Sequence, residues 1–385
     1  MGDFDYHPLL YKVKNSIDLY LGKMKYQNKE VYLEFVIVML IIVFYLSVIK
    51  LTTSSLVPTH PDFANPTWDH HWYIEMASNP IVVLKQTINA PYCYRILMPI
   101  LVWLMPFDLT LNFQILTMLF LFFSGLILYI ILKESYSKIL SLAGLTLFYT
   151  SPWIAKFLIY DFWLTDSITF FFILLCFFAI IKSNTILYCV SLFLGVLSKE
   201  IMLFTIPVFL ISEYIKMNQK GLFKKRYILR CLSAILPGFI IYIVIRIIIR
   251  QPNIEYISIF PFDLREITRF ILTLSIPIYY YVYTFSTWGI ICTIFPLANK
   301  KSILLTWLKQ YGVFIGLIYC QLLIAADNER ILIAGFFPII LLTVSGFERV
   351  CIKKNISQLY FMALCIICFI MNIIIGPIFS LFIRF

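Results

Sequence analysis

Apolar segments of membrane-spanning length follow one another along almost the whole chain, and they restrict its fold more than any other feature. A helix of about 20 apolar residues crosses the hydrocarbon core of a bilayer with its backbone polar groups bonded internally. Hydrophobic residues make up 61% of the chain and charged residues only 13%, a balance outside the soluble range. Candidate spans lie at 33–51, 96–132, 139–153, 162–181, 185–197, 201–215, 228–249, 267–298, 303–325, 331–347 and 358–383.

These segments predict an all-α fold, a polytopic transmembrane helical bundle of about 10–12 spans. A cytoplasmic amino-terminal segment at 1–32 precedes a single transmembrane domain at 33–385. That domain includes a large, partly helical first extracytoplasmic loop at 52–95, which is too polar to cross lipid. The chain is therefore expected to be a multi-pass membrane protein, and a cell membrane is the expected location.

Two apolar runs, at 96–132 and 267–298, are longer than one crossing requires. Each is expected to contain an extra interfacial or re-entrant piece. Because proline removes a helical hydrogen bond, Pro106 and Pro277 mark the expected breaks.

The positions of lysine and arginine predict the orientation of the spans. Most of the 31 basic residues fall in the amino-terminal segment and in alternate short loops, which are the cytoplasmic ones if the amino terminus is inside. Segment parity then places the loop at 52–95, Asp161, the Lys199-Glu200 pair and the turn at 327–330 together on the opposite face. This convergence predicts one site assembled from distant parts of the sequence.

The loop carries the first candidate residues. Asp69 and Tyr73 are four residues apart and share one face of a helix that begins here. Asp69 is either a helix cap or a catalytic carboxylate, and the two roles are compatible. His70 can ligate a divalent metal, the one cofactor that the sequence indicates, although adjacent His71 would diverge by about 100° on a helix. A hydrogen bond at headgroup depth is the more ordinary role for such a histidine.

Basic and tyrosine side chains stand where later spans begin. Tyr94 and Arg95 directly precede an apolar run. Arg95 is therefore either an anchor whose charged end reaches the membrane surface or a contact for an anion. Lys199 and Glu200 lie between two short apolar segments, which predicts a recessed turn. Lys199 is expected to bind phosphate with Glu200 positioning it; the alternative is a structural ion pair.

Three further charged residues complete the candidate set. Asp161 and Asp166 flank the mouth of another short hairpin, and either can serve as a second carboxylate, with helix capping as the alternative for Asp161. Arg330 opens a helix after the charged turn at 327–330 and can complete a set of cations around a phosphate. An ordinary surface turn is the alternative there.

Four short motifs carry a resemblance to a known family. The chain reads DHHWYIEMA at 69–77, PYCYRILMP at 91–99, LSKE at 197–200 and ADNERILIAGFFP at 326–338. Their order resembles the GT-C superfamily of integral-membrane glycosyltransferases, and the resemblance spans most of the chain.

That resemblance implies sugar transfer at the extracytoplasmic side, from a polyprenyl-phosphate donor to a glycan, lipid or protein acceptor, with inversion at the anomeric carbon. It implies that an acid of the first outer loop is the base, which is Asp69 in this chain. The family often has two acids close together here, whereas His70 and His71 follow Asp69. This departure leaves the second acid and any metal dependence open.

Other classes of function fit the sequence less well. A secondary transporter would place its charges near the bilayer midplane, whereas the charges here gather at one face, with Asp166 the main exception. It would also show inverted repeats, and the two halves of this sequence show no correspondence. A membrane polysaccharide polymerase or ligase would use a diphosphate donor, which the same cations suit equally well. The net charge of +11 does not indicate nucleic-acid binding, because the basic residues sit in loops that face membrane lipids.

Overall fold

The computed structural model describes residues 28–54, 70–85, 88, 90–220, 224–249, 288–321 and 332–382, and this part of the chain contains helices and no strand. The all-α prediction is therefore confirmed for the described residues. The first half of the bundle is built from α2 (Asn28–Ser54), α3 (His70–Ser78), η1 (Pro80–Lys85), η2 (Tyr92–Tyr94), α4 (Leu97–Trp103), α5 (Leu109–Ser135), α6 (Lys138–Thr150), η3 (Pro152–Lys156), α7 (Phe157–Tyr160) and α8 (Asp166–Ile181). The second half contains α9 (Thr185–Ser198), η4 (Glu200–Phe204), α10 (Thr205–Lys220), α11 (Lys224–Ile248), a helix at Trp288–Leu297, α14 (Lys301–Gln321), α16 (Phe336–Lys354) and α17 (Gln358–Phe382).

In the described part of the chain, apolar helices long enough to cross a membrane are fewer than the candidate spans of the whole sequence. Among the described residues, four helices qualify, and a bent pair of helices at 138–160 would make a fifth. Other expected spans are present as shorter apolar helices, such as α8 with 16 residues, which at about 1.5 Å per residue is shorter than a bilayer core. The chain thus has the helices of a membrane protein.

The long apolar run at 96–132 is broken where the sequence predicts, around Pro106. α4 ends at Trp103, and the Asp108 carboxylate begins α5 by accepting a hydrogen bond from the backbone N–H of Leu111 at 2.9 Å. The Asn112 amide fixes the connection by donating to three backbone carbonyl oxygens, at 3.0 to 3.2 Å. The second expected break, at Pro277, lies outside the described residues.

A second break bends the chain by 56° between α6 and the segment at 152–160. Pro152 has no N–H to continue the α6 hydrogen bonds, and a π-helical turn follows it. The redirected segment ends at the Asp161 turn, from which α8 starts. This bend therefore brings the beginning of α8 toward the loop helices.

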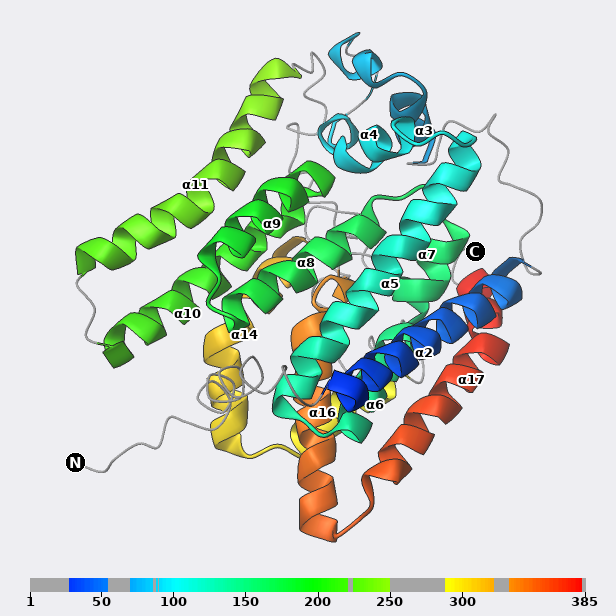
Figure 1. The fold of residues 1–385 in the computed structure, drawn as a ribbon, viewed down its shortest axis with the longest axis vertical. Helices are drawn as coiled ribbons and strands as arrows, with labels where there is room; N and C mark the ends of the chain where they lie inside the picture. Colours follow the sequence, from blue (N-terminus) through cyan, green and yellow to red (C-terminus); the bar gives the residue numbers. More distant parts are fainter. Residues whose placement is uncertain are drawn as a thin grey trace.

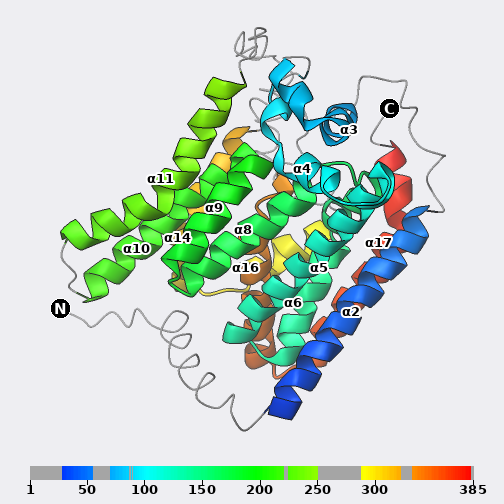
Figure 2. The same ribbon diagram turned by 45° about the horizontal axis from the view of Figure 1, so that its top comes forward.

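Helices α8 and α9 form a hairpin near the centre of the bundle, as Figures 1 and 2 show, with α5 on one side and α10 and α11 on the other. Phe170 and Phe177 of α8 pack against Phe336 and Phe337 of α16. At the open end of the hairpin, the Thr169 hydroxyl donates to the Ser198 hydroxyl at 3.1 Å. The start of α8 and the end of α9 are therefore held together beneath α3 and α4.

Candidate functional site

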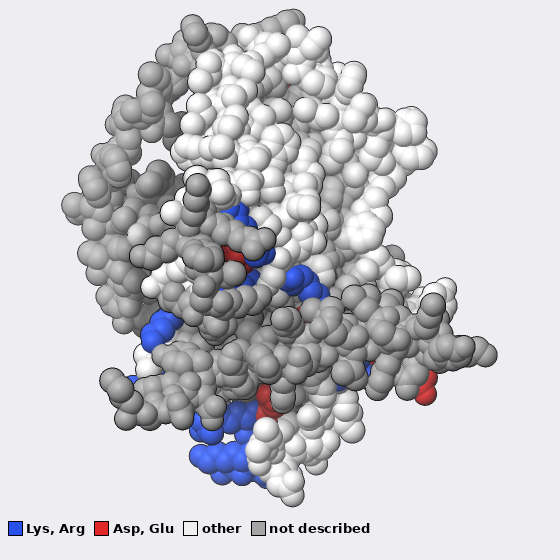
Figure 3. All heavy atoms as spheres, turned by 60° about the vertical axis from the view of Figure 1, so that its left-hand side comes forward, with Lys and Arg blue, Asp and Glu red and all other residues white. Residues whose placement is uncertain are grey.

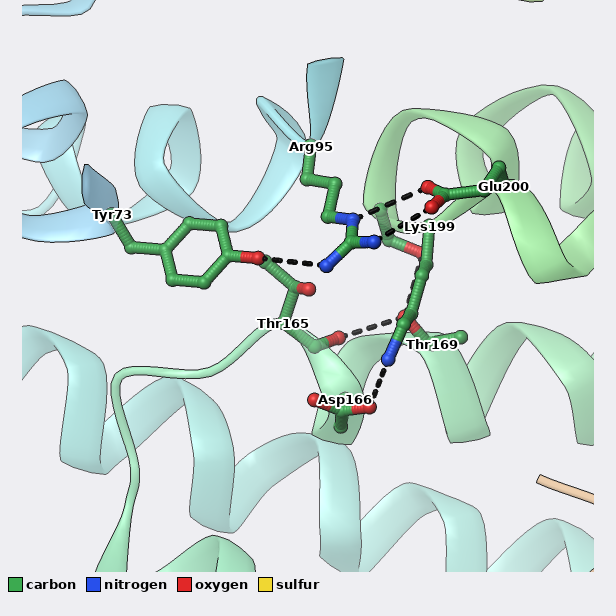
Figure 4. A network of polar contacts seen from close by, with 8 residues as sticks. Tyr73, Arg95, Thr165, Asp166, Thr169, Lys199 and Glu200 are labelled. Atoms are coloured by element: carbon green, nitrogen blue, oxygen red, sulfur yellow. Dashed lines mark hydrogen bonds and ion pairs between the residues drawn. The ribbon is translucent and has the colours of Figure 1, made fainter. Parts of the chain in front are cut away.

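Five of the predicted site residues meet at one end of the bundle (Figure 4). Tyr73 comes from α3, Arg95 from the end of η2, Asp166 from the start of α8, and Lys199 and Glu200 from the turn between α9 and η4. We call these five residues the site cluster. Their positions span more than a hundred residues of sequence, so the cluster confirms that the first loop and the α8–α9 hairpin share one end.

Arg95 connects the loop to the α8–α9 hairpin through a bidentate ion pair with Glu200. Its Nε and Nη2 atoms donate to the two carboxylate oxygens of Glu200, at 3.2 and 2.6 Å, and its Nη1 donates to the Tyr73 hydroxyl at 3.3 Å. Arg95 and Tyr73 are buried. A guanidinium and a carboxylate matched in this way fix direction as well as charge.

Lys199 forms the second ion pair of the site cluster. Its Nζ atom lies 2.6 Å from Oδ1 of Asp166, and both side chains are buried. Lys199 can reach Asp166 because it ends α9 in an extended conformation that turns the chain away from the helix axis. Two charges withdrawn from water in this way stabilise each other, and losing one would leave the other buried alone.

The pairing differs from the one predicted. Glu200 was expected to position Lys199, yet its carboxylate binds Arg95, and Lys199 binds Asp166. The reason is geometric, because adjacent residues at a helix end point in different directions. The expected recession of this turn agrees with the burial of Ser198 and Lys199.

The Arg95–Glu200 pair sets the protonation of both partners. Burial alone would raise the pKa of the Glu200 carboxyl, but the positive charge of Arg95 and its hydrogen bonds lower it to about 2. Burial likewise opposes the charge on Arg95, and Glu200 outweighs it, so the pKa of Arg95 is raised well above its ordinary value. Both groups are therefore charged at neutral pH.

Tyr94 lies beside the site cluster and contacts a different cation. The centre of its ring lies 4.4 Å from the guanidinium carbon of Arg246. The same carbon lies 3.6 Å from the centre of the Tyr242 ring. The sequence favours a lipid anchor for Arg246, because an arginine near the end of an apolar helix commonly has that role, with binding of the donor as the alternative.

Thr165 belongs to the surroundings of the site cluster and was not predicted from the sequence. Its side chain is buried, makes no capping bond to α8, and its hydroxyl has no hydrogen-bond partner among the described residues. Figure 4 shows it between Tyr73 and the Asp166–Lys199 pair. A threonine directly before an acidic residue at a hairpin mouth was the available signal.

The remaining predicted residues are Asp69, His70, Asp161 and Arg330. Asp69 and Arg330 lie outside the described residues, and α3 begins at His70, whose side chain lies outside them as well. Asp161 is half-buried in the turn before α8, where its backbone N–H donates to the Phe157 carbonyl at 2.7 Å. In the described part of the chain, no group of three His, Cys, Asp or Glu side chains could hold a metal ion.

A second set of ion pairs lies at the opposite end of the helices. Its members are Glu34 with Lys133 and Lys138, Glu134 with Lys182, and Glu213 with Lys216 and Arg230. These turn-end pairs link the start of α2 to the α5–α6 turn, the end of α5 to the end of α8, and α10 to the start of α11. Figure 3 shows Lys and Arg side chains gathered toward the lower end of the molecule, below a largely uncharged surface.

Comparisons with known proteins give no relative: no family model, curated protein or solved structure matches this chain. The class of protein that fold and site define is thus a helical protein with apolar helices of membrane-spanning length and a buried cluster of ion pairs at one end.

Proposed function

We propose that the chain is an integral-membrane glycosyltransferase that moves a sugar from a polyprenyl-phosphate donor to an extracytoplasmic glycan, lipid or protein acceptor. The observation that carries the proposal is the meeting of Tyr73 and Arg95 from the loop with Asp166, Lys199 and Glu200 from the α8–α9 hairpin. Buried charges are costly in a membrane protein and mark functional sites more often than structural ones. The four motifs of the sequence supply the reaction type.

In the proposed reaction, a hydroxyl of the acceptor attacks the anomeric carbon of the donor sugar. Asp69 accepts the hydroxyl proton, the new carbon–oxygen bond forms, and the bond to the phosphate oxygen breaks with its electron pair leaving on the phosphate. General-base assistance of this kind contributes roughly 10²- to 10⁴-fold. One displacement inverts the anomeric carbon, so no covalent sugar intermediate on the protein is needed.

The site residues would divide the remaining work. Arg95 donates three of its five N–H groups to Glu200 and Tyr73. The other two could form hydrogen bonds to an oxygen of the polyprenyl-phosphate sugar. Lys199, held by Asp166, would add positive charge near the leaving phosphate, and Arg330 would complete the set of cations. Asp161 or Asp166 would orient the acceptor hydroxyl, and Tyr94 would contact the donor. A divalent metal at His70 would be an addition to this set.

The direct test is to measure lipid-linked sugars in cells that lack this protein. One polyprenyl-phosphate sugar should accumulate, and wild-type protein should restore its level. Asp69→Asn should not restore it at equal expression, whereas Glu75→Gln, which changes another acid of the same loop, should. An unchanged pool of lipid-linked sugars in the deletion cells would contradict the proposal.

A secondary transporter is the second candidate, and the buried Asp166–Lys199 pair between helices favours it. The two functions differ in their energy source. Transfer by protein reconstituted into vesicles with donor and acceptor, but without an ion gradient, would support the enzyme. Gradient-dependent solute uptake without transfer would support the transporter. Accumulation of a diphosphate-linked oligosaccharide in the deletion cells would instead indicate a polymerase or ligase.

A further inference from the structure

An apolar groove runs beside the site cluster, between the loop helices and the end of α11. It has a volume of about 300 Å³ and is lined only by apolar residues, among them Met76, Pro80, Ile96, Ile100, Ile245 and Ile248. Met76 lies one helical turn after Tyr73, and Ile96 directly follows Arg95. The groove therefore begins where the site cluster ends.

A cation without a carboxylate partner stands next to this groove. Arg246 follows the groove residue Ile245 in α11, and its guanidinium lies between the rings of Tyr94 and Tyr242. No Asp or Glu within the described ranges forms an ion pair with it, in contrast to Arg95 and Lys199. The rings hold the guanidinium in place by cation–π contact, and its Nη1 donates to the Tyr242 carbonyl at 3.3 Å; neither contact brings a negative charge.

We propose that this groove binds the first hydrocarbon units of a polyprenyl phosphate and that Arg246 binds its phosphate. The inference rests on the proposed function and assigns a subsite and a residue to it. The site cluster has two cations and two carboxylates, so it brings no net charge to an anion, whereas Arg246 does. The groove is at the small end of ligand pockets and suits part of one chain better than a two-chain phospholipid.

The position of the groove orients the ligand. A chain lying against Met76 and Ile96 would present its head group to Tyr94, Arg95 and Arg246, because Tyr94 and Arg95 directly precede the groove residue Ile96 and Arg246 directly follows the groove residue Ile245. An arginine suits this role, since its planar guanidinium binds two phosphate oxygens at once. The sugar would then point from Arg246 toward the site cluster.

The experiment measures equilibrium binding of radiolabelled polyprenyl phosphate to the full-length protein in phosphatidylcholine nanodiscs. Arg246→Gln should weaken binding about ten- to a hundredfold, which corresponds to one lost charge-assisted contact. Binding of the uncharged polyprenol should not change in this variant. Arg246→Lys should lie between wild type and Arg246→Gln, because it keeps the charge and loses the two-pronged geometry.

Two neighbouring residues of α11 give a matched control for the groove. Ile248 lines the groove and Ile247 does not, although the two are equally accessible, at 60% and 59% exposed. Ile248→Trp should fill the groove and weaken binding of both lipids at least tenfold, whereas Ile247→Trp should bind as wild type does. Wild-type binding by Ile248→Trp would overturn the proposal.

Competition by phosphatidylglycerol as effective as that by unlabelled polyprenyl phosphate would also overturn it, because the groove would then hold any anionic membrane lipid. This assay involves no sugar transfer. If the binding pattern is found but lipid-linked sugars do not respond to deletion of the protein, the proposed reaction is wrong and the lipid site stands.

Discussion

The site cluster and the turn-end pairs both hold buried or partly buried carboxylates against cations, but they differ in how far the cations reach water. At the turn end, Glu34 and Glu213 each bind two cations, and the outer cation is accessible: Lys138 is 60% exposed and Arg230 38% exposed in their side chains. In the site cluster Glu200 binds Arg95 and Asp166 binds Lys199, and the side chains of these two cations are only 9% and 11% exposed.

Under the proposed function, this difference separates charges that set the orientation of the helices from charges that bind a ligand. Exposed lysines and arginines at one end of a bundle follow from the retention of positive charge on the cytoplasmic face. Burying Arg95 and Lys199 at the other end gives no such benefit and costs the hydration of both cations. A ligand that contacts them is the simplest physical reason for that cost.

The largest expected effect comes from removing one charge of the Lys199–Asp166 pair. Asp166→Asn leaves Lys199 buried with its charge unmatched, so the free energy of unfolding should fall by about 3–5 kcal/mol. Thermal unfolding in detergent measures this change. The double variant Asp166→Asn with Lys199→Met should recover most of the stability and still show no transfer. Recovered transfer in the double variant would show that the Asp166–Lys199 pair only stabilises the fold, as the turn-end pairs are expected to do.

Replacing Arg95 tests whether its geometry matters beyond its charge. Arg95→Lys keeps the positive charge but cannot bind both oxygens of Glu200 and the Tyr73 hydroxyl together. Stability should fall by about 1.5–3 kcal/mol, and transfer should fall roughly tenfold or more. Limited proteolysis should cut residues 70–95 faster than in wild type. A variant with wild-type proteolysis and transfer would show that Arg95 is an anchor.

A matched change at the turn end should affect stability alone. Glu213→Gln removes the carboxylate shared by Lys216 and Arg230, and the partly exposed Arg230 can then be hydrated. We expect a loss of about 1–2 kcal/mol, smaller than at Asp166, because a cation that reaches water is not left buried. Transfer per folded molecule should match wild type. A tenfold loss of transfer here would break the distinction between the two ends.

The sequence predicted the shared end of the site residues better than it predicted their contacts. Alternation of basic loops placed the first loop, which ends at Arg95, on the same face as the Lys199-Glu200 pair, because span parity depends only on the number of crossings. Which acid binds which cation depends on the directions of side chains at helix ends, so Glu200 was assigned to Lys199 rather than to Arg95. The break at Pro106 was predictable because proline acts locally, through its own missing N–H.

The number of spans and the role of Arg246 were harder to predict, for different reasons. Hydropathy does not distinguish a crossing helix from a short helix buried inside the protein, so α8 and α9 were counted as spans although they are shorter than a bilayer core. For Arg246 the sequence favoured a lipid anchor over donor binding, because its contacts with two tyrosine rings could not be predicted and Tyr94 lies about 150 residues away in sequence. Such contacts follow from the packing of α11 against the loop.

The smallest expected effect follows a change of pH. It sharpens the comparison because the hydrogen exchange of the loop at 70–95 should depend on the Arg95–Glu200 pair and not on the turn-end pairs. The pKa of Glu200 is lowered to about 2 from 4.5, so its pairing with Arg95 stabilises the fold fully above pH 4.5 and is lost as the pH falls toward 2. Between about pH 5 and 8 this pair should therefore have no effect. Hydrogen exchange of residues 70–95 should accelerate from pH 4.5 downward, beyond the intrinsic exchange rate, in wild type. In Glu200→Gln the loop should exchange fast at every pH, since no charge remains to titrate; equal pH dependence in both proteins would mean that another group holds the loop.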